Sequence, residues 1–493
     1  MSKKILASPS GIILRGLQDL DPLIFRSLGP NKSTTLIGNT LRSHYSGLLD
    51  RLQSTDTNRE ALQLLLTVAG EVKSRSGSGI RPALILTSGL ASAVHRLLVA
   101  GIPEHSLRGY LSGLSAAFEG ILFSRAERFS SECSGLSPGW LERSAATTAC
   151  GDPQTGGIIG DICRGVGSEG YIKLSVSHRP GITITRSLGY TLEYKSLLSR
   201  DCKAISGPTL LWLSDSVICD LQGVLSALVL GRDLGRSLLI MAPAISKDVR
   251  KLIEHNVRQG TVSATAVIPP EYELDRHMVL RDLSLAFGTP LFGDACQDFR
   301  SDMLAPIDVD ITGRVLSMRT PQVIPSTVAR LSREMRSVLS PRQSLSLRRH
   351  LCALTGKSAE LCIGGESRVQ AEDYYNLVES TVQVVRGAQR SGFIPGSYQI
   401  FDDFRTKFRR EFPVPLLTAM AAPFDALMQP WRESGALLVE HTSGDVFDVT
   451  AGVYRPVTVM GLVDSVFSLQ TAVATAVSAV KEYVLAGILV RES

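Results

Sequence analysis

Hydrophobic residues recur at spacings of three and four along the first quarter of the chain. The stretches 48–72, LLDRLQSTDTNREALQLLLTVAGEV, and 88–123, SGLASAVHRLLVAGIPEHSLRGYLSGLSAAFEGILF, both show this spacing, which is typical of amphipathic helices. The Gly-Ile-Pro sequence at 101–103 predicts a break between two helices. Residues 11–125 are therefore expected to be mainly helical.

The pattern changes in the centre of the chain, at roughly 183–355. Short apolar runs are bounded there by turn residues, and helical segments separate them, which points to an α/β unit. Before this unit, alternating apolar residues near the end of the Ser- and Gly-rich stretch 126–182 predict strands. The apolar runs are GPTLLWLSD, RSLLIMAPA and VSATAVIPP, and the helical segments are LQGVLSALVLGRDL and SKDVRKLIEHNVRQ.

Helical periodicity returns at 371–392 and in the Ala- and Val-rich tail 468–490. The predicted order is helical, small mixed, α/β, small mixed, helical. Because the two ends match in type and an α/β segment lies between them, we expect the ends to form one domain.

Composition sets broad limits on the function. The chain has 493 residues, of which 44% are hydrophobic and 20% charged, and its formal net charge is +5. This is a globular composition with enough chain for several domains. Lys and Arg are scattered, so solvated helix faces are favoured over a nucleic-acid surface. No window reaches the ~20 uninterrupted apolar residues of a membrane span, and we expect neither a nucleic-acid nor a membrane partner.

The eight cysteines form no Cys-x-x-Cys pair and do not cluster with histidine. They indicate thiols of a reducing compartment and not a zinc site or a disulfide framework. The first residues, MSKKILASPSG, have a charged start without the apolar core of a signal peptide. A cytoplasmic protein is the expectation.

Five stretches carry a more specific signal. They are SLGP at 27–30, SRSGSGIRPALIL at 74–86 with the later turn VAGIPEHSLRG, GGIIGDICRGVGSEGYIKL at 156–174, LGRSLLIMAPAI at 234–245 and FDVTAGVYRPVTVMGLVDS at 447–465. In this order, and across nearly the whole chain, they resemble the group I (GroEL-type) chaperonins. The glycines of GDICRGVGSEG also imitate a dinucleotide fingerprint, but no predicted strand precedes them and the chaperonin resemblance accounts for them.

The resemblance implies an α+β multidomain chaperonin with a helical equatorial domain, a small intermediate domain and an α/β apical domain. Such proteins form rings, use ATP to move their apical domains and take up non-native polypeptides under a co-chaperonin cap. The implied boundaries are 1–125 and 391–493 for the equatorial domain, 126–182 and 358–390 for the intermediate domain, and 183–357 for the apical domain.

The resemblance also implies an ATP site, whose phosphates lie on glycine-rich turns because only glycine allows so close a backbone approach. A later carboxylate binds the ribose hydroxyls. The residues of this sequence that match the ATP-binding pattern are Leu28, Gly29, Pro30, Gly77, Gly79, Gly396 and, for the ribose, Asp464.

The acids of that site are missing. The family's metal-binding and catalytic aspartates align with Ser46, Ser78 and Ser380. A hydroxyl carries no formal charge and replaces a carboxylate neither as a ligand of Mg²⁺ nor as a base. We expect no catalytic residue and no metal ligand, weak ATP binding at best, and slow or absent hydrolysis.

Neighbouring residues leave alternatives open. Arg81 stands where the family has threonine, and its guanidinium either neutralises phosphate charge in place of Mg²⁺ or is a solvated loop residue in an inactive site. A shifted alignment would make Asp50 the acid in place of Ser46. Glu379 precedes Ser380, but adjacent helical positions point about 100° apart.

The family binds clients in an apolar groove between two apical helices. The aligned client-binding residues are Tyr194, Leu225 and Leu228, although leucines of this kind more often pack in a core. The second helix of the groove is more polar here, with Arg250, Glu254 and His255 where the family has aliphatic residues. A half-polar groove predicts a narrower set of partners and weaker docking of a co-chaperonin.

Two functions remain open. The first is a chaperonin that binds non-native polypeptides, with an ATP-binding fold and impaired hydrolysis. The second is a chaperonin-derived scaffold with a specialised partner that no longer hydrolyses ATP. Either would form a homo-oligomeric ring or assemble together with a standard chaperonin. A metabolic enzyme would need an acid–base or metal constellation, and the sequence shows none.

Overall fold

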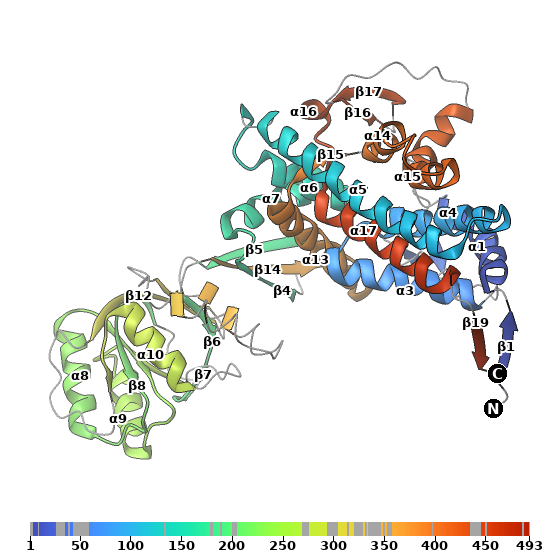
Figure 1. The fold of residues 1–493 in the computed structure, drawn as a ribbon. Helices are drawn as coiled ribbons and strands as arrows, with labels where there is room; N and C mark the ends of the chain where they lie inside the picture. The colour runs from blue at the N-terminus through green and yellow to red at the C-terminus, as the bar shows by residue number, and fades with distance from the viewer. Residues whose placement is uncertain are drawn as a thin grey trace. The chain divides into compact units, whose positions relative to one another are not determined.

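The computed structural model describes the chain in segments (Figure 1). These are 3–7, 9–25, 35–37, 40–42, 59–132, 135–177, 181–187, 190–199, 205–268, 276–292, 304–312, 315–319, 357–396, 398–433, 445–448, 451–485 and 488–492, with a few residues between 329 and 352. The chain divides into two compact units. Unit 1 is Met1–Ser168, Val176–Ile182 and Ile363–Ser493, and unit 2 is Glu169–Ser175 and Thr183–Cys362.

Unit 1 is helical and is built from both ends of the chain, as the sequence predicts. The predicted break at 101–103 is confirmed, because one helix ends at Val99 and the next begins at Glu104. Its described helices are α1 (Pro9–Phe25), α3 (Arg59–Ser76), α4 (Ile80–Val99), α5 (Glu104–Glu132), α6 (Trp140–Cys150), α7 (Pro153–Val166), α13 (Arg368–Ser391), α14 (Gln399–Lys407), α15 (Val414–Glu433), α16 (Val457–Met460), α17 (Val466–Ala479) and the π-helix η2 (Val480–Val484).

Helix α4 lies at the centre of this unit and packs against α1, α3, α15 and α17. It is long and apolar enough to cross a membrane, but 67% of its most apolar window is buried inside the unit. Leucines and alanines cover most of its surface, including Ala83, Leu84, Leu86 and Leu90, so the hydrophobic effect holds it within the bundle. Its hydrophobicity is accounted for by this core position.

The end of the chain differs from the prediction. The sequence predicts a helix to residue 490, whereas α17 gives way to η2, and β19 (Ile488–Glu492) pairs antiparallel with β1 (Lys3–Ala7). Figure 1 shows both termini at this two-stranded ribbon. The pairing joins the first and last residues of the chain, so local periodicity gives no sign of it.

Close packing explains the glycines of the imitated dinucleotide motif. Gly160 lies inside α7 where that helix crosses α6, and a Cβ atom there would come within 2.5 Å of the Arg143 backbone. Asp152 caps the start of α7 by accepting hydrogen bonds from the backbone N–H groups of Gln154 and Thr155. The motif is a helix–helix contact and follows a helix, not a strand.

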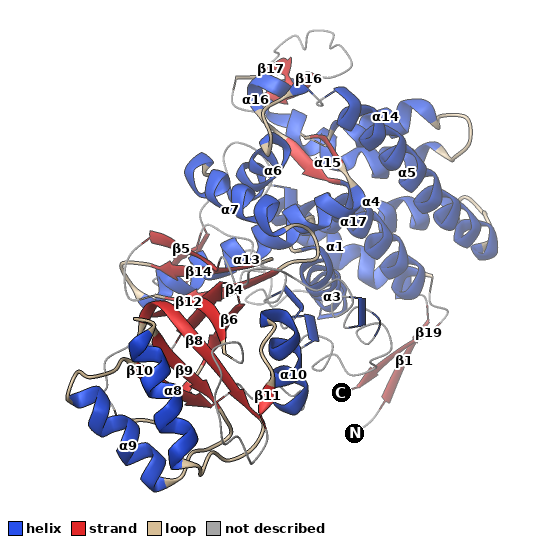
Figure 2. Cartoon of the chain, turned by 90° about the vertical axis from the view of Figure 1, so that its left-hand side faces the viewer, coloured by secondary structure: helices blue, strands red, loops and turns tan. Residues whose placement is uncertain are grey.

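Unit 2 is the predicted α/β unit, and Figure 2 shows its strands in red. The central strands β8 (Ser206–Ser214), β9 (Ser237–Met241) and β10 (Ala264–Ile268) are parallel. The full order is β6-β13-β12-β8-β9-β10-β7, and β11 also pairs with β8. The remaining strands are β6 (Tyr190–Glu193), β7 (Lys195–Ser196), β11 (Leu291–Phe292), β12 (Ala305–Thr312) and β13 (Val315–Arg319).

Helices cover both faces of this sheet, which is why its central strands are continuous apolar runs. Successive residues of a strand point to opposite faces. Leu210 and Trp212 pack in a cluster with α8 (Leu221–Asp233) and α9 (Lys247–Arg258). Leu211 and Leu213 pack in the opposite cluster with α10 (Arg276–Phe287).

A small sheet lies where the chain passes between the units. Its order is β4 (Tyr171–Val176), β14 (Ser358–Gly364) and β5 (Gly181–Ser187). The first and last of these strands are the ones predicted by alternation within 126–182. The five-part domain division stays a prediction.

Candidate nucleotide site

The loop between α3 and α4 needs glycine for its backbone. Gly77 and Gly79 have φ angles of 70° and 90°, a left-handed region in which residues with a Cβ atom are strained. The loop is held by the hydroxyl of Ser76, whose Oγ lies 2.9 Å from the carbonyl oxygen of Val72 and 2.7 Å from that of Ser78. Ser76 is buried and Ser78 is half-buried.

Packing requires glycine at the same two positions. A Cβ atom on Gly77 would lie 2.8 Å from the carbonyl oxygen of Ser380 in α13, and one on Gly79 would lie 2.8 Å from that of Ser468 in α17. The loop is therefore pressed between helices that are distant in the sequence. This contact places the loop of Ser78 beside Ser380, so two of the three aligned acid positions come together.

Neither serine supplies a charge. Ser380 is 8% exposed, and its hydroxyl donates to the carbonyl of Leu377 in its own helix at 2.9 Å. Glu379 is half-buried on the neighbouring helical position. The described residues contain no group of three His, Cys, Asp or Glu side chains that could hold a metal ion. Mg²⁺, which favours carboxylate oxygens, does not fit the side chains of this part of the site.

A second wall of the site comes from β15 (Phe393–Pro395) and β18 (Val463–Ser465). The two strands are antiparallel, with Ile394 opposite Asp464. The N–H of Gly396 donates to the carbonyl of Leu462 at 2.9 Å, and a Cβ atom on Gly396 would lie 3.1 Å from the same carbonyl. Packing therefore favours glycine at this third predicted position.

Asp464 lies in an environment that disfavours its charge. Burial raises the pKa of Asp464 to about 7, although a hydrogen bond from the backbone N–H of Tyr398 acts in the opposite direction. Its Oδ2 atom is buried and has no hydrogen-bond partner. Asp464, which is predicted to bind a ribose, therefore has one carboxylate oxygen that accepts no hydrogen bond.

Tyr398 connects this acid to Arg81. Its φ angle of 55° is the only positive value among the described non-glycine residues, which marks a strained backbone. Burial and the charge of Asp464 raise the pKa of the phenol, and the charge of Arg81 lowers it. Sequence reasoning did not single out Tyr398, because nothing in a tyrosine itself signals a left-handed backbone.

Arg81 is not a loop residue. It lies in the first turn of α4 and is half-buried, and its Nε atom is fully buried without a hydrogen-bond partner. Burial lowers the pKa of its guanidinium. The structure thus brings Gly77, Gly79, Arg81, Ser380, Gly396, Tyr398 and Asp464 into one region of unit 1.

Four residues of the sequence prediction lie outside the described segments. They are Leu28, Gly29 and Pro30 of the first phosphate turn and Ser46 of the first aligned acid. Asp50, the alternative to Ser46, lies outside them as well.

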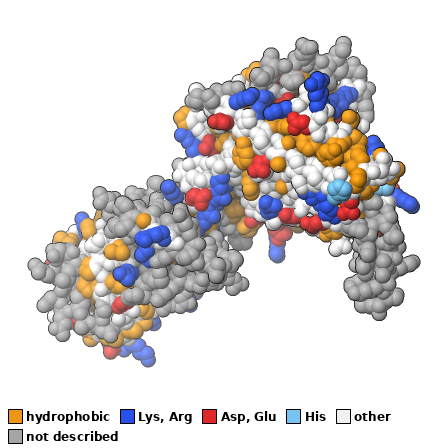
Figure 3. Space-filling view, in the orientation of Figure 1, with side chains coloured by type: hydrophobic (Ala, Val, Ile, Leu, Met, Phe, Trp, Pro, Cys, Tyr) orange, Lys and Arg blue, Asp and Glu red, His pale blue; other side chains and the backbone are white. Residues whose placement is uncertain are grey.

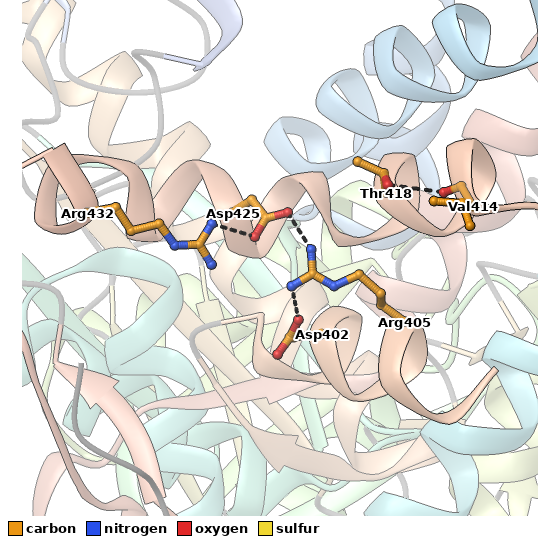
Figure 4. A network of polar contacts seen from close by, with 6 residues as sticks. All are labelled: Asp402, Arg405, Val414, Thr418, Asp425 and Arg432. Carbon is orange, nitrogen blue, oxygen red and sulfur yellow. Dashed lines mark hydrogen bonds and ion pairs between the residues drawn. The ribbon is translucent and has the colours of Figure 1, made fainter. Parts of the chain in front are cut away.

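A network of charges fixes the helix that follows Tyr398. In Figure 4, Arg405 of α14 reaches Asp402 in its own helix and Asp425 of α15, and Arg432 reaches the other oxygen of Asp425. The two contacts to Asp425 are 2.9 and 3.0 Å long. These acids are already paired with arginine, so they are poor candidates for a metal.

The predicted client-binding residues in unit 2 have different environments. Leu228 is 2% exposed and belongs to the core under α8, whereas Leu225 is 42% exposed. Tyr194 is half-buried against the opposite apolar cluster. Leu221, Leu225 and Val229 are all exposed and are spaced by four, so they form one stripe along α8.

The second predicted groove helix, α9, is polar on its exposed side. Arg250 and His255 are exposed, and Glu254 accepts a hydrogen bond from the backbone N–H of Ser199 at 2.8 Å. Its buried side consists of Val249 and Ile253. The client role of these helices stays a prediction.

Comparisons with known proteins place these features in context. The chain matches no family model. It is 23% identical to heat shock protein 60 of Emericella nidulans over 94% of this chain and 84% of that protein. It is 24% identical to the chaperonin GroEL of Holospora obtusa over 81% of this chain and 76% of that protein.

The fold has a solved counterpart as well. The chaperonin gp146 of bacteriophage EL, crystallised in the presence of ATP-BeFx, matches 99% of this chain with a TM-score of 0.58 and 14% identity. The predicted multidomain α+β chaperonin fold is therefore confirmed. Together, the similarity to heat shock protein 60 and GroEL along most of the chain and the matching fold support a divergent group I chaperonin.

Proposed function

We propose that this protein is a chaperonin that binds non-native polypeptides, forms rings, and binds ATP weakly while hydrolysing it slowly or not at all. The chaperonin relatives along nearly the whole chain support the general function. One observation supports the impaired hydrolysis: Ser78 and Ser380 occupy aligned acid positions on a loop and a helix that touch at Gly77, where a carboxylate is needed to hold Mg²⁺ or to activate water.

The client surface is the stripe of Leu221, Leu225 and Val229 on α8. Figure 3 shows hydrophobic side chains at the surface of the part that carries α8 and α9. Folding of unit 2 does not use these three residues, because the buried side of α8 consists of other residues such as Val224, Ala227 and Leu228. An apolar stripe left in solvent attracts exposed apolar segments of other chains without sequence specificity.

The polar side of α9 favours a second candidate function, a scaffold for a specialised partner. Arg250 and His255 would face any chain that lies along α9 and would restrict it to segments with complementary charge or hydrogen-bonding groups. The same polar side would weaken the docking of a co-chaperonin. A broad or narrow range of clients distinguishes the two candidates.

Ring formation is supported by the terminal ribbon. An isolated two-stranded ribbon has unpaired N–H and C=O groups on both outer edges and is only marginally stable. In the described segments, β1 pairs with β19 and with no third strand. A strand from a neighbouring copy would complete the ribbon.

The compartment stays a prediction. The relatives include proteins named as mitochondrial as well as a bacterial GroEL, and the cytoplasmic location rests on the sequence alone.

Two measurements on the full chain test this function. Native mass spectrometry with and without ATP reports ring size and nucleotide response together, and a monomer in both conditions would contradict the proposal. Suppression of aggregation of a chemically denatured protein tests client binding. The triple change L221S/L225S/V229S should abolish suppression, while L285S should not, because Leu285 is equally exposed, at 42%, but lies on α10.

A further inference from the structure

Arg81 carries a charge that the described part of unit 1 does not balance. Its guanidinium forms no ion pair with a carboxylate of the described residues, and its Nε atom is buried without a partner. A partly buried cation without a partner is costly unless a negative group completes its contacts. A neutral residue at this position would avoid the cost. The presence of arginine is therefore explained if a bound anion balances its charge.

Other buried polar atoms on the elements that meet this region also lack partners. Each lies on an element already placed in this region: Ser468 contacts Gly79, Gln399 follows Tyr398, and Ser465 ends β18. Buried unpartnered polar atoms are rare in proteins, and a group of them indicates a place where a ligand completes the hydrogen bonds. The atoms are Arg81 Nε, Gln399 Oε1, Asp464 Oδ2, Ser465 Oγ and Ser468 Oγ, and all three of Gln399, Ser465 and Ser468 are more than nine-tenths buried.

The site fits an anion better than it fits a metal ion. Ser78 and Ser380 provide hydroxyl groups where carboxylates would be needed, and no acidic cluster is found in the described segments. The helix that begins after Gly79 has no side-chain cap and no acid in its first turn, so its N-terminal N–H groups add to the positive field of Arg81.

We propose that Arg81 binds the phosphates of a nucleotide directly, so that this protein takes up ATP without a divalent cation. This inference rests on the proposed nucleotide site and replaces its metal by a residue of the chain. A guanidinium is planar and always charged, and it donates two parallel hydrogen bonds to a phosphate. Asp464, which like Arg81 interacts with Tyr398, would accept hydrogen bonds from the ribose. Such a site holds nucleotide but activates no water.

The test is equilibrium binding of ATP to the full chain, measured by calorimetry in EDTA and in excess Mg²⁺. The two dissociation constants should agree within about threefold, and inorganic tripolyphosphate should compete with ATP in EDTA. R81M should weaken binding in EDTA by at least tenfold. The matched control is R75M, which removes an exposed arginine at the end of α3 that pairs with Glu71 at 3.2 Å, and it should leave binding unchanged.

The variant R81K distinguishes a loss of phosphate contacts from a folding defect in R81M. Lysine keeps the charge but loses the planar pair of donors, so binding in EDTA should weaken by about three- to tenfold with unchanged circular dichroism. Binding that requires Mg²⁺ would overturn the inference while leaving nucleotide binding intact. If wild-type protein bound no ATP in either condition but still suppressed aggregation, the inference would fail and the chaperonin function would stand.

Discussion

The loop at Gly77–Gly79 in unit 1 and helix α8 in unit 2 differ in which of their residues the fold constrains. In the loop, the glycines are required by left-handed φ angles and by carbonyl oxygens 2.8 Å from where a Cβ would be. The intervening Ser78 is half-buried and is not fixed in this way. In α8, Val224 and Leu228 are fixed by the core, while Leu221 and Leu225 are free to be polar.

The positions predicted to carry function differ between the two units. In unit 1, the positions that would carry acidic chemistry are serine, so the backbone cradle is kept without its charges. In unit 2, the solvent side of α8 is still apolar, although apolar residues there do nothing for the fold. This difference is the basis of the proposal that the protein binds polypeptide but hydrolyses ATP slowly or not at all.

The largest expected effect comes from returning the acids. S78D combined with S380D should raise Mg²⁺-dependent ATP hydrolysis at least hundredfold over wild type, because a positioned base contributes about 10²–10⁴ in rate. Each single change should do far less, since metal binding and water activation are both needed. Phosphate release in a coupled assay measures the rate. Wild-type protein that already hydrolyses ATP at the rate of an ordinary chaperonin would remove the contrast between the two units.

Glycine substitutions sharpen the claim that folding fixes the loop. G79A should lower the free energy of unfolding by about 2–4 kcal/mol, because the new Cβ meets a backbone carbonyl and the φ angle of 90° is strained for alanine. G70A is the control: it lies in α3 with nothing within 4 Å of its Cβ position, and it should stabilise by about 0.5–1 kcal/mol. Urea denaturation followed by circular dichroism measures both. Equal effects would show that packing does not dictate the loop.

Substitutions of two leucines in α8 distinguish a core role from a surface role in unit 2. L228A should cost about 2–4 kcal/mol of stability, because it leaves a cavity in the cluster under the helix. L225A should change stability by no more than about 0.5 kcal/mol while weakening suppression of aggregation. Denaturation and light scattering report the two outcomes. A loss of client binding only in L228A would place the client surface elsewhere.

The smallest effect concerns pH. The pKa of Asp464 is raised to about 7 in the folded protein from 3.8, so the folded state holds this proton more tightly and its contribution to stability falls as pH rises from about 4 to 7. D464N removes the penalty and should be more stable than wild type at pH 8 by roughly 1–2 kcal/mol, since partial solvent contact reduces the full effect. The gain should fade toward pH 5.

Urea denaturation at both pH values measures this change. D19N replaces an exposed acid of α1 and should show no such dependence. A gain for D464N that is the same at pH 5 and pH 8 would mean that the carboxyl group is not the cause.

Much of the fold could be read from the sequence because helices and strands have local signatures. The structure has helices α13 and α17 where helical periodicity predicts them, and strands β8, β9 and β10 where the apolar runs predict strands. The predicted break at 101–103 is also present. The ribbon of β1 and β19 does not, because its stability depends on a partner at the opposite end of the chain.

The candidate site was predictable only in part. Gly77, Gly79, Gly396 and Asp464 come from the resemblance, and the structure places them in one region. Tyr398 was missed, because its left-handed backbone and its interactions with Arg81 and Asp464 cannot be read from the sequence. Leu225 and Leu228 were predicted together, but one faces solvent and the other the core.

The sequence by itself determined which side chains are present: serine at the aligned acid positions, arginine in the first turn of α4, and leucines along α8. It also determined the order of helical and α/β segments, since side-chain period is a local property. Only the tertiary structure decided which residues meet, which pKa values shift and which leucines are buried. Contacts between distant segments arise from packing, and burial acts on a charge only after those contacts exist.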